Sequence, residues 1–180
     1  MKKTITFFAA LLIVSSINAQ QTSTANQIED ALNQKNALTK NSIVKNIKFT
    51  NIGPTIMSGR VVDIDVNPKN TNEFYVGYAS GGLWYTNNNG TSFTPVMDNS
   101  PTQNVGDIAV DWKNGTIWVG TGESNSSRSS YPGIGILKST DKGKTWQNVG
   151  LTDSQHIGRI IINKNNPDEV VVGVIGHLYS

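Results

Sequence analysis

The sequence contains no cysteine, and charged residues make up only 16% of its 180 residues. Without cysteine, neither disulfide bonds nor a cysteine nucleophile is available to the chain. The charged fraction is well below the ~25% of an average globular domain and disfavours coiled coils and long helices. After Val14 no apolar run approaches the ~20 residues of a membrane-spanning helix.

Asparagine and glycine take the place of charge, with 21 Asn and 17 Gly. Both residues accept positive φ angles, and Asn side chains bond to the backbone of their own turns, so the composition favours turn-rich β structure. The net charge of +2 comes from Lys2 and Lys3; without them, 13 basic residues balance 13 acidic residues. This balance excludes a basic nucleic-acid-binding surface.

The first nineteen residues have the pattern of a secretory signal peptide. Two lysines precede the apolar run Ile5–Val14, and small residues ending in Ala19 form a cleavage site. The alternative is a buried N-terminal helix or strand. The pattern predicts an exported protein, either secreted, periplasmic or at the cell surface, without membrane insertion after cleavage.

Residues 20–48 are rich in Gln, Asn, Thr and Ser and are predicted to form a polar spacer. Faint helical spacing follows Thr24 or Asn26 as a cap and indicates one short helix. Its apolar stripe is too thin for a buried helix.

The rest of the chain repeats. Similar β-like runs occur in the same order in each repeat; they lie at 59–67, 73–78, 82–86 and 92–97, then at 105–111, 116–120, 135–139 and 145–149, and finally at 157–163 and 169–174. Four short strands per ~45 residues, separated by Asn/Gly turns, are typical of a β-propeller blade. We predict an all-β propeller with blades at about 51–100, 101–150 and 151–180, the last incomplete.

Because a propeller buries its apolar faces only between blades, the chain is expected to be the N-terminal piece of a longer propeller and to pack against its remaining blades. Residues 20–180 alone are then expected to expose the apolar flank of the third blade and to be poorly soluble.

The turn between the third and fourth strands carries the most specific motif, S-T-D-x-G-x-T-W. Its residues are Ser139, Asp141, Gly143, Thr145 and Trp146, and Asn88, Gly90 and Phe93 occupy the same places in the first repeat. A short carboxylate can accept the amide groups of such a turn, so we interpret it as structural. Calcium would require more oxygen ligands at close spacing.

This turn resembles the Asp-box, or bacterial neuraminidase repeat. The stretches 51–54, 58–60, 79–84, 120–123 and 156–159 are similar to secreted bacterial propellers related to the sortilin N-terminal propeller and to the xyloglucanase family of glycoside hydrolases. The resemblance covers about residues 47–180. It implies an exported Asp-box propeller and speaks only weakly for an activity.

Two enzymatic mechanisms do not carry over from this resemblance. Xyloglucanases of this kind use paired Asp residues, one in a T-D-V-G-G stretch; the matching stretch Tyr78–Leu83 has the glycines but no carboxylate. Sialidases gather three arginines, and the chain has three, but Arg60, Arg128 and Arg159 do not follow the sialidase spacing.

Other chemistries lack a motif. There is no phosphate-binding loop, and His156 and His177 are not spaced as zinc ligands, so no metal or cofactor is predicted. The four tryptophans could stack on sugars, but three of them lie in repeat strands, which favours core packing.

Two function classes follow. The first is a ligand-binding or scaffold module for a glycan, a peptide or a protein, similar to sortilin. The alternative is a glycoside hydrolase, xyloglucanase-like or sialidase-like, whose acids lie in blades outside this chain. Carboxylate pairs on loops of later blades would favour the enzyme.

The expected ligand site is the face where first strands begin. Arg60 and Arg159 are expected to share one position there, and the long 122–133 loop belongs to the same face. The ligand-binding candidates are Arg60, Glu123, Asn125, Arg128, Tyr131 and Arg159. Such a positive rim suits a carboxylate or sulfate. The alternative is that the arginines pair with carboxylates of neighbouring blades.

Overall fold

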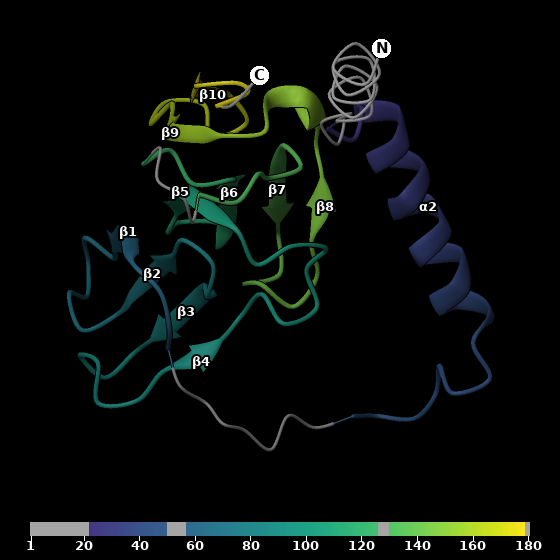
Figure 1. Ribbon diagram of the computed structural model, residues 1–180. Coiled ribbons are helices and arrows are strands. Elements are labelled where there is room, and N and C mark those ends of the chain that lie inside the picture. Colours follow the sequence, from purple (N-terminus) through teal and green to yellow (C-terminus); the bar gives the residue numbers. More distant parts are fainter. Residues whose placement is uncertain (1–21, 50–56, 126–129, 179–180) are drawn as a thin grey trace, which may run out of the picture.

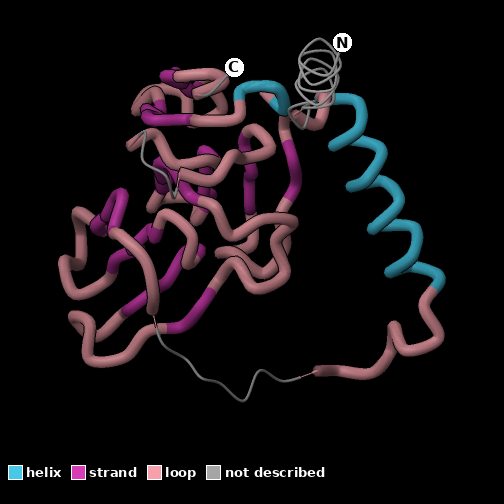
Figure 2. Tube along the Cα trace, in the orientation of Figure 1, coloured by secondary structure: helices cyan, strands magenta, loops and turns pink. Residues whose placement is uncertain are grey.

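The computed structural model describes residues 22–49, 57–125 and 130–178. The predicted signal peptide lies outside these residues. Figure 1 shows a helix, α2, standing beside a stack of small β-sheets, and Figure 2 shows that the described chain after α2 consists of strands and loops apart from one short helical segment.

The helix α2 spans Ala25–Asn41, longer than the short helix expected in the spacer. Thr24 caps it in a reciprocal capping box: the Gln27 amide donates to Thr24 Oγ1 (3.3 Å) and the Thr24 amide donates to Gln27 Oε1 (2.9 Å). None of its residues is buried, in agreement with its thin apolar stripe. Within the described residues, no helix combines the length and apolarity needed to cross a bilayer.

Two antiparallel four-stranded sheets and one hairpin follow. The first sheet contains β1 (Val61–Val66), β2 (Phe74–Tyr78), β3 (Gly82–Thr86) and β4 (Thr94–Pro95) in that order. The second contains β5 (Val105–Asp111), β6 (Thr116–Thr121), β7 (Ile136–Ser139) and β8 (Gln147–Asn148). The 3-10 helix η1 (Thr152–Ser154) then leads to the hairpin of β9 (Ile157–Ile162) and β10 (Val170–Val174). The predicted all-β propeller architecture is confirmed.

Apolar side chains between successive blades form the core. The first cluster, between the two sheets, contains Tyr75, Leu83, Met97, Val105, Ile108, Ile117, Val119 and Leu137. The second joins the second sheet to the hairpin through Ala109, Trp118, Ile136, Ile157 and Ile160. Trp84 and Trp118 are both buried, as expected of strand tryptophans.

The hairpin leaves apolar side chains in solvent: Val171 is 70% exposed and Ile161 55% exposed. The low solubility expected for residues 20–180 stays a prediction, and this surface supports it.

Each first strand carries a β-bulge that defines the register of the blades. Val61 faces Tyr78 and Asp63 faces Gly77 in the first blade. The same pattern repeats in the second, where Asp107 faces Gly120, and in the hairpin, where Arg159 faces Gly173. Asp63, Asp107 and Arg159 are therefore equivalent positions.

The expectation that Arg60 and Arg159 share a position is therefore wrong. Counted from the bulge, the residue equivalent to Arg60 is His156, three residues before Arg159. An alignment on Gly59 and Gly158 misses this offset, because Gly59 precedes the first strand whereas Gly158 is the unpaired residue of the bulge.

Aspartate carboxylates hydrogen-bond the first strand of each blade to the first strand of the next blade. Asp63 Oδ2 accepts the amide of Ile108 (3.3 Å), and the equivalent Asp107 Oδ2 accepts the amide of Ile160 (2.6 Å). Asp65 accepts the amide of Val110 (2.9 Å) in the same way. These bonds satisfy backbone donors that a sheet with its own edge would leave unpaired.

The turn between β7 and β8 closes around Asp141. Its carboxylate accepts the Ser139 hydroxyl (2.8 Å), the Thr145 amide (2.9 Å) and the Thr145 hydroxyl (2.6 Å). Gly143, at φ +84°, donates its amide to Ser139 Oγ (2.8 Å). Trp146 Nε1 donates to the Val96 carbonyl (2.9 Å) and so anchors the turn to the preceding blade.

The turn between β3 and β4 repeats this geometry with an amide. Asn88 Oδ1 accepts the Thr86 hydroxyl (2.9 Å) and the Ser92 amide (3.0 Å), and the Gly90 amide donates to Thr86 Oγ1 (3.0 Å). Phe93, in the place of Trp146, packs edge-on against Phe74 with ring centroids 6.0 Å apart.

We predict that Asp141→Asn changes the pH dependence of the protein's stability under acidic conditions. Hydrogen bonds, above all from Thr145, lower the pKa of Asp141 from 3.8 to about 2. A depressed carboxyl pKa contributes stability above pH 3.8 that is lost as the pH falls through about 2. The melting-temperature difference between wild type and Asp141→Asn should therefore shrink between pH 4 and pH 2.

Asn88→Asp is the matched control, because it places a carboxylate in the equivalent turn. It should add a similar acid dependence. Identical pH profiles for wild type and Asp141→Asn would contradict the prediction.

Candidate functional site

The candidate site lies at the rim where first strands begin and second strands end. Three backbone bonds with the same geometry define this rim: the amides of Ala79, Gly122 and Ile175 donate to the carbonyls of Arg60, Asn104 and His156. The β3–β4 turn lies at the other end of the blade, where the Asn89 amide donates to the Asn72 carbonyl (2.9 Å).

Glu123 is the centre of the site. It lies two residues after Thr121, the last residue of β6, and its side chain is only 1% exposed. Arg60 Nε donates to Oε1 (2.8 Å), and Arg60 Nη2 donates to Oε2, so the pair is bidentate. This contact bridges the first and second blades, and hydrogen bonding to Glu123 raises the pKa of Arg60.

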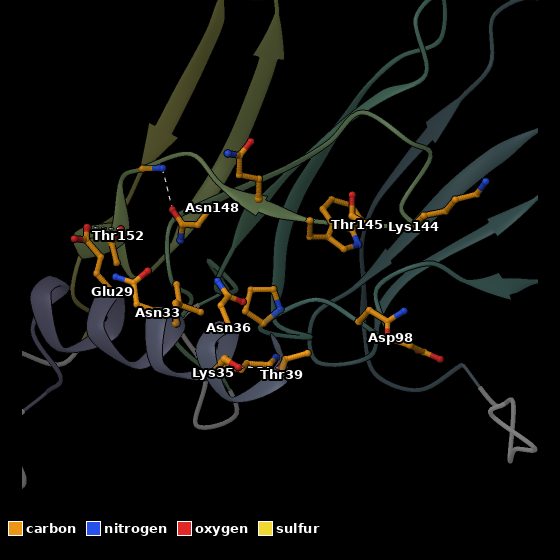
Figure 3. Close-up of a pocket in the computed structure, with 16 residues that line it drawn as sticks. Glu29, Asn33, Lys35, Asn36, Thr39, Asp98, Lys144, Thr145, Asn148 and Thr152 are labelled. Atoms are coloured by element: carbon orange, nitrogen blue, oxygen red, sulfur yellow. Dashed lines mark hydrogen bonds between the residues drawn. The ribbon is translucent and has the colours of Figure 1, made fainter. Parts of the chain in front are cut away.

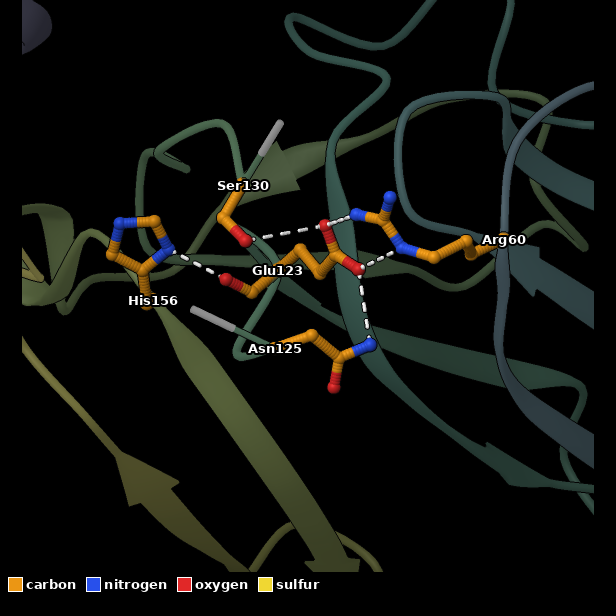
Figure 4. A network of polar contacts seen from close by, with 5 residues as sticks. All are labelled: Arg60, Glu123, Asn125, Ser130 and His156. Carbon is orange, nitrogen blue, oxygen red and sulfur yellow. Dashed lines mark hydrogen bonds and ion pairs between the residues drawn. The ribbon is translucent and has the colours of Figure 1, made fainter. Parts of the chain in front are cut away.

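Two side chains of the 122–133 loop complete the carboxylate shell. Asn125 Nδ2 donates to Glu123 Oε1 (3.1 Å), and Ser130 Oγ donates to Oε2 (3.5 Å). Figure 4 shows the three donors approaching the carboxylate from different sides. The Arg60 side chain is 46% exposed, so its guanidinium lies at the surface although its partner is buried.

His156 supports the same residue from the third blade. Its Nδ1 lies 2.8 Å from the backbone carbonyl of Glu123. Because a carbonyl only accepts, Nδ1 is the donor in this contact. The ring is buried, with the residue 3% exposed.

The backbone beside His156 is held in an unusual conformation. Gln155 has φ 51° and ψ −41°, and its carbonyl accepts the Gly133 amide (2.6 Å). Gly122, at φ +83°, packs so closely that a Cβ there would overlap the Gln155 carbonyl oxygen. Such local strain concentrates at functional sites and is maintained by the surrounding contacts.

The structure brings only part of the predicted set together. Arg60, Glu123 and Asn125 form one cluster, and Tyr131 lies on the same loop, 53% exposed. Arg159 does not join it: Nη1 lies 3.4 Å from Asp107 Oδ1, and the residue lines a groove of about 670 Å³ along β1, β5 and β9. Arg128 lies outside the described residues.

Both described arginines contact a carboxylate of the neighbouring blade, Arg60 with Glu123 and Arg159 with Asp107. The alternative expected from the sequence, interblade ion pairs, is therefore what these side chains form. The ion pair does not by itself preclude ligand binding, because the Arg60 side chain is 46% exposed.

Sequence reasoning missed three residues of the rim: Asn104, Ser130 and His156. Asn104 Nδ2 donates to the Pro132 carbonyl (2.9 Å) and so contacts the end of the 122–133 loop. The register of the bulges is the signal that could have identified Asn104 and His156 as equivalents of Arg60. Among the described residues, no group of three or more His, Asp or Glu is arranged to hold a metal ion.

Comparison with known proteins finds similarity only at the level of structure. No family model matches the chain, and no curated protein matches it. An ancestral GH74 enzyme is similar with a TM-score of 0.51 and 21% identity over 66% of this chain. The GH74 enzyme of Niastella koreensis has a TM-score of 0.45 and 22% identity over 57% of this chain. The chain spans 17% and 16% of their lengths, and the first similarity supports the propeller fold.

Proposed function

We propose that the protein binds a glycan at the Arg60–Glu123 rim, as part of a propeller of the glycoside hydrolase type. The observation that carries the proposal is a half-exposed arginine whose orientation is set by a buried carboxylate. Similarity to an ancestral GH74 enzyme supports the hydrolase-type context, and the predicted signal peptide supports an exported protein.

The geometry favours an acidic glycan. Glu123 holds one edge of the planar guanidinium through Nε and Nη2, so the orientation of the half-exposed Arg60 side chain is defined before a ligand arrives. Preorganisation of this kind lowers the entropic cost of binding a carboxylate or sulfate. Asn125 and Tyr131 add exposed polar and aromatic surface on the adjacent loop.

Hydrolysis is the second candidate, favoured by the GH74 similarity. It requires two carboxyl groups, ~5–9.5 Å apart, one of which acts as an acid. In the described part of the rim, the carboxylate beside Arg60 is that of Glu123, which is buried and ion-paired. We infer that a hydrolase acting at this rim would take its acid–base pair from other blades of the propeller. A sortilin-like peptide-binding or scaffold role is the remaining alternative.

Arg60→Ala is expected to weaken binding of a uronic-acid hexasaccharide by about tenfold or more, since charge-assisted hydrogen bonds contribute ~1.5–3 kcal/mol. Asn125→Ala, at an exposed position, should weaken it less. Isothermal titration calorimetry measures both, circular dichroism verifies folding, and release of reducing ends reports hydrolysis.

Arg159→Ala is the matched control, because it removes an arginine that pairs with Asp107 away from the rim. It should bind the hexasaccharide as wild type does. Folded Arg60→Ala protein with unchanged affinity would refute the rim as the binding site, and binding of acidic peptides in place of glycans would favour the scaffold role.

A further inference from the structure

A second cleft lies on the outer side of the second blade, away from the rim. It has a volume of about 980 Å³, at the upper end of the ~300–1,000 Å³ typical of ligand sites. One wall is the α2 helix, and the other is formed by β8, the turn before it and the segment 98–101. Figure 3 shows side chains from both walls directed into the space between them.

The lining is polar without a net charge. Glu29 and Asp98 are balanced by Lys35 and Lys144. The other polar groups are amides and hydroxyls from Asn33, Asn36, Thr39, Asn99, Thr145, Gln147, Asn148 and Thr152. Amides both donate and accept hydrogen bonds, which matches sugar hydroxyls, whereas the charge balance favours neither an anion nor a cation.

Apolar surface comes from Trp146 and Pro101 on the blade side of the cleft and from Leu32 on α2. Trp146 is half-buried, and its Nε1 bond to the Val96 carbonyl fixes the ring. A rigid indole beside amide groups combines apolar contact with directional hydrogen bonding, the mixture that a pyranose ring requires.

The two walls are joined at one end. The buried Thr152 donates its hydroxyl to Glu29 Oε1 (3.5 Å), while no residue of α2 is buried. A ligand in the cleft would therefore bridge the helix to the blade and add order to α2. A peptide is a poorer fit, because strand addition needs an extended edge and β8 has two residues.

From this chemistry, the geometry points to a binding site for a neutral oligosaccharide between α2 and β8. The inference does not depend on the proposed function of the rim, since the two sites share no lining residue.

The test uses three neutral hexasaccharides, built of β-1,4-glucose, α-1,4-glucose and β-1,4-mannose, with calorimetry and hydrogen exchange. At least one should bind and slow amide exchange across Ala25–Asn41. The double variant Asn33→Ala/Asn36→Ala should weaken that binding about tenfold, the loss of two hydrogen bonds. Both positions are exposed in a helix, where alanine is well tolerated.

Gln34→Ala is the matched control: it removes an amide from the same helix at a position outside the cleft lining. It should bind as wild type does, and Arg60→Ala should too, which separates this site from the rim. Absence of binding and protection with all three sugars would overturn the inference, as would equal affinities of the double variant and wild type.

Discussion

Gly120→Ala is expected to lower the free energy of unfolding by about 1–3 kcal/mol, the usual cost of overpacking a core. Gly120 lies in β6 opposite the bulge at Asp107, where the hairpin packs against the second sheet. A Cβ there would overlap Ile157, with Ile157 Cβ only 2.9 Å away. Ile157 is fully buried and cannot move aside without disturbing the second core cluster.

The chain provides its own control at Gly173, the equivalent position in β10. A Cβ there would meet Arg159 Cβ at 3.5 Å, an ordinary contact. Gly173→Ala should change stability by less than about 0.5 kcal/mol. Urea denaturation measures the free energy of unfolding of both variants and of wild type. Equal losses of stability in the two variants would show that glycine is required by the strand itself and not by the packing between blades.

Most of the β elements could be predicted from the sequence, because each is a run of Val, Ile, Tyr or Trp between Asn/Gly turns. The run at 105–111 and the run at 82–86 coincide with β5 and β3. The fourth strands are shorter than predicted: β4 and β8 have two residues each. The apolar residues Val96 and Trp146 of the predicted runs lie outside these two strands and pack against the first core cluster.

The hydrogen bonds of the Asp141 turn could be anticipated because they join residues four apart or fewer. The rim could not, because its contacts join residues far apart. Arg60 and Glu123 are 63 positions apart, and His156 contacts a backbone carbonyl that leaves no mark on the sequence. The loop length and its polar residues identified the region; the bulge register decides which residues meet there.

The carboxylates that join successive first strands can be recognised in the sequence only as a repeated aspartate. Asp63 and Asp107 align in the sequence, but their partners are amides of the following blade. Such donors are common to every residue, so a single sequence does not reveal which amide is bound.

Asp107→Ala and Asp107→Asn are expected to affect stability in opposite ways. Alanine leaves the amide of the buried Ile160 without its acceptor, which costs about 1–3 kcal/mol. Asparagine retains an oxygen for that amide and removes a buried charge. Asp107→Asn should therefore be at least as stable as wild type at pH 7.

The pH dependence separates these effects. Burial, with a further contribution from Asp63, raises the pKa of Asp107 from 3.8 to about 6. A raised carboxyl pKa means that the folded chain binds the proton more tightly, so the associated stability is complete below pH 3.8 and is lost as the pH rises through about 6. The advantage of Asp107→Asn over wild type should accordingly be present at pH 7 and decrease toward pH 4.

Denaturation of the three proteins at pH 4, 5.5 and 7 measures this difference directly. Comparison with wild type at each pH cancels the titrating groups that do not interact with Asp107, because the variants differ from wild type at one site. If Asp107→Asn loses as much stability as Asp107→Ala at pH 7, the charge of Asp107 is itself required, and its ion pair with Arg159 outweighs the cost of burial. If Asp107→Asn is more stable than wild type at pH 7 but not at pH 4, the first strands are joined by hydrogen bonds that do not require the charge of Asp107. A neutral side chain then supplies these bonds equally well.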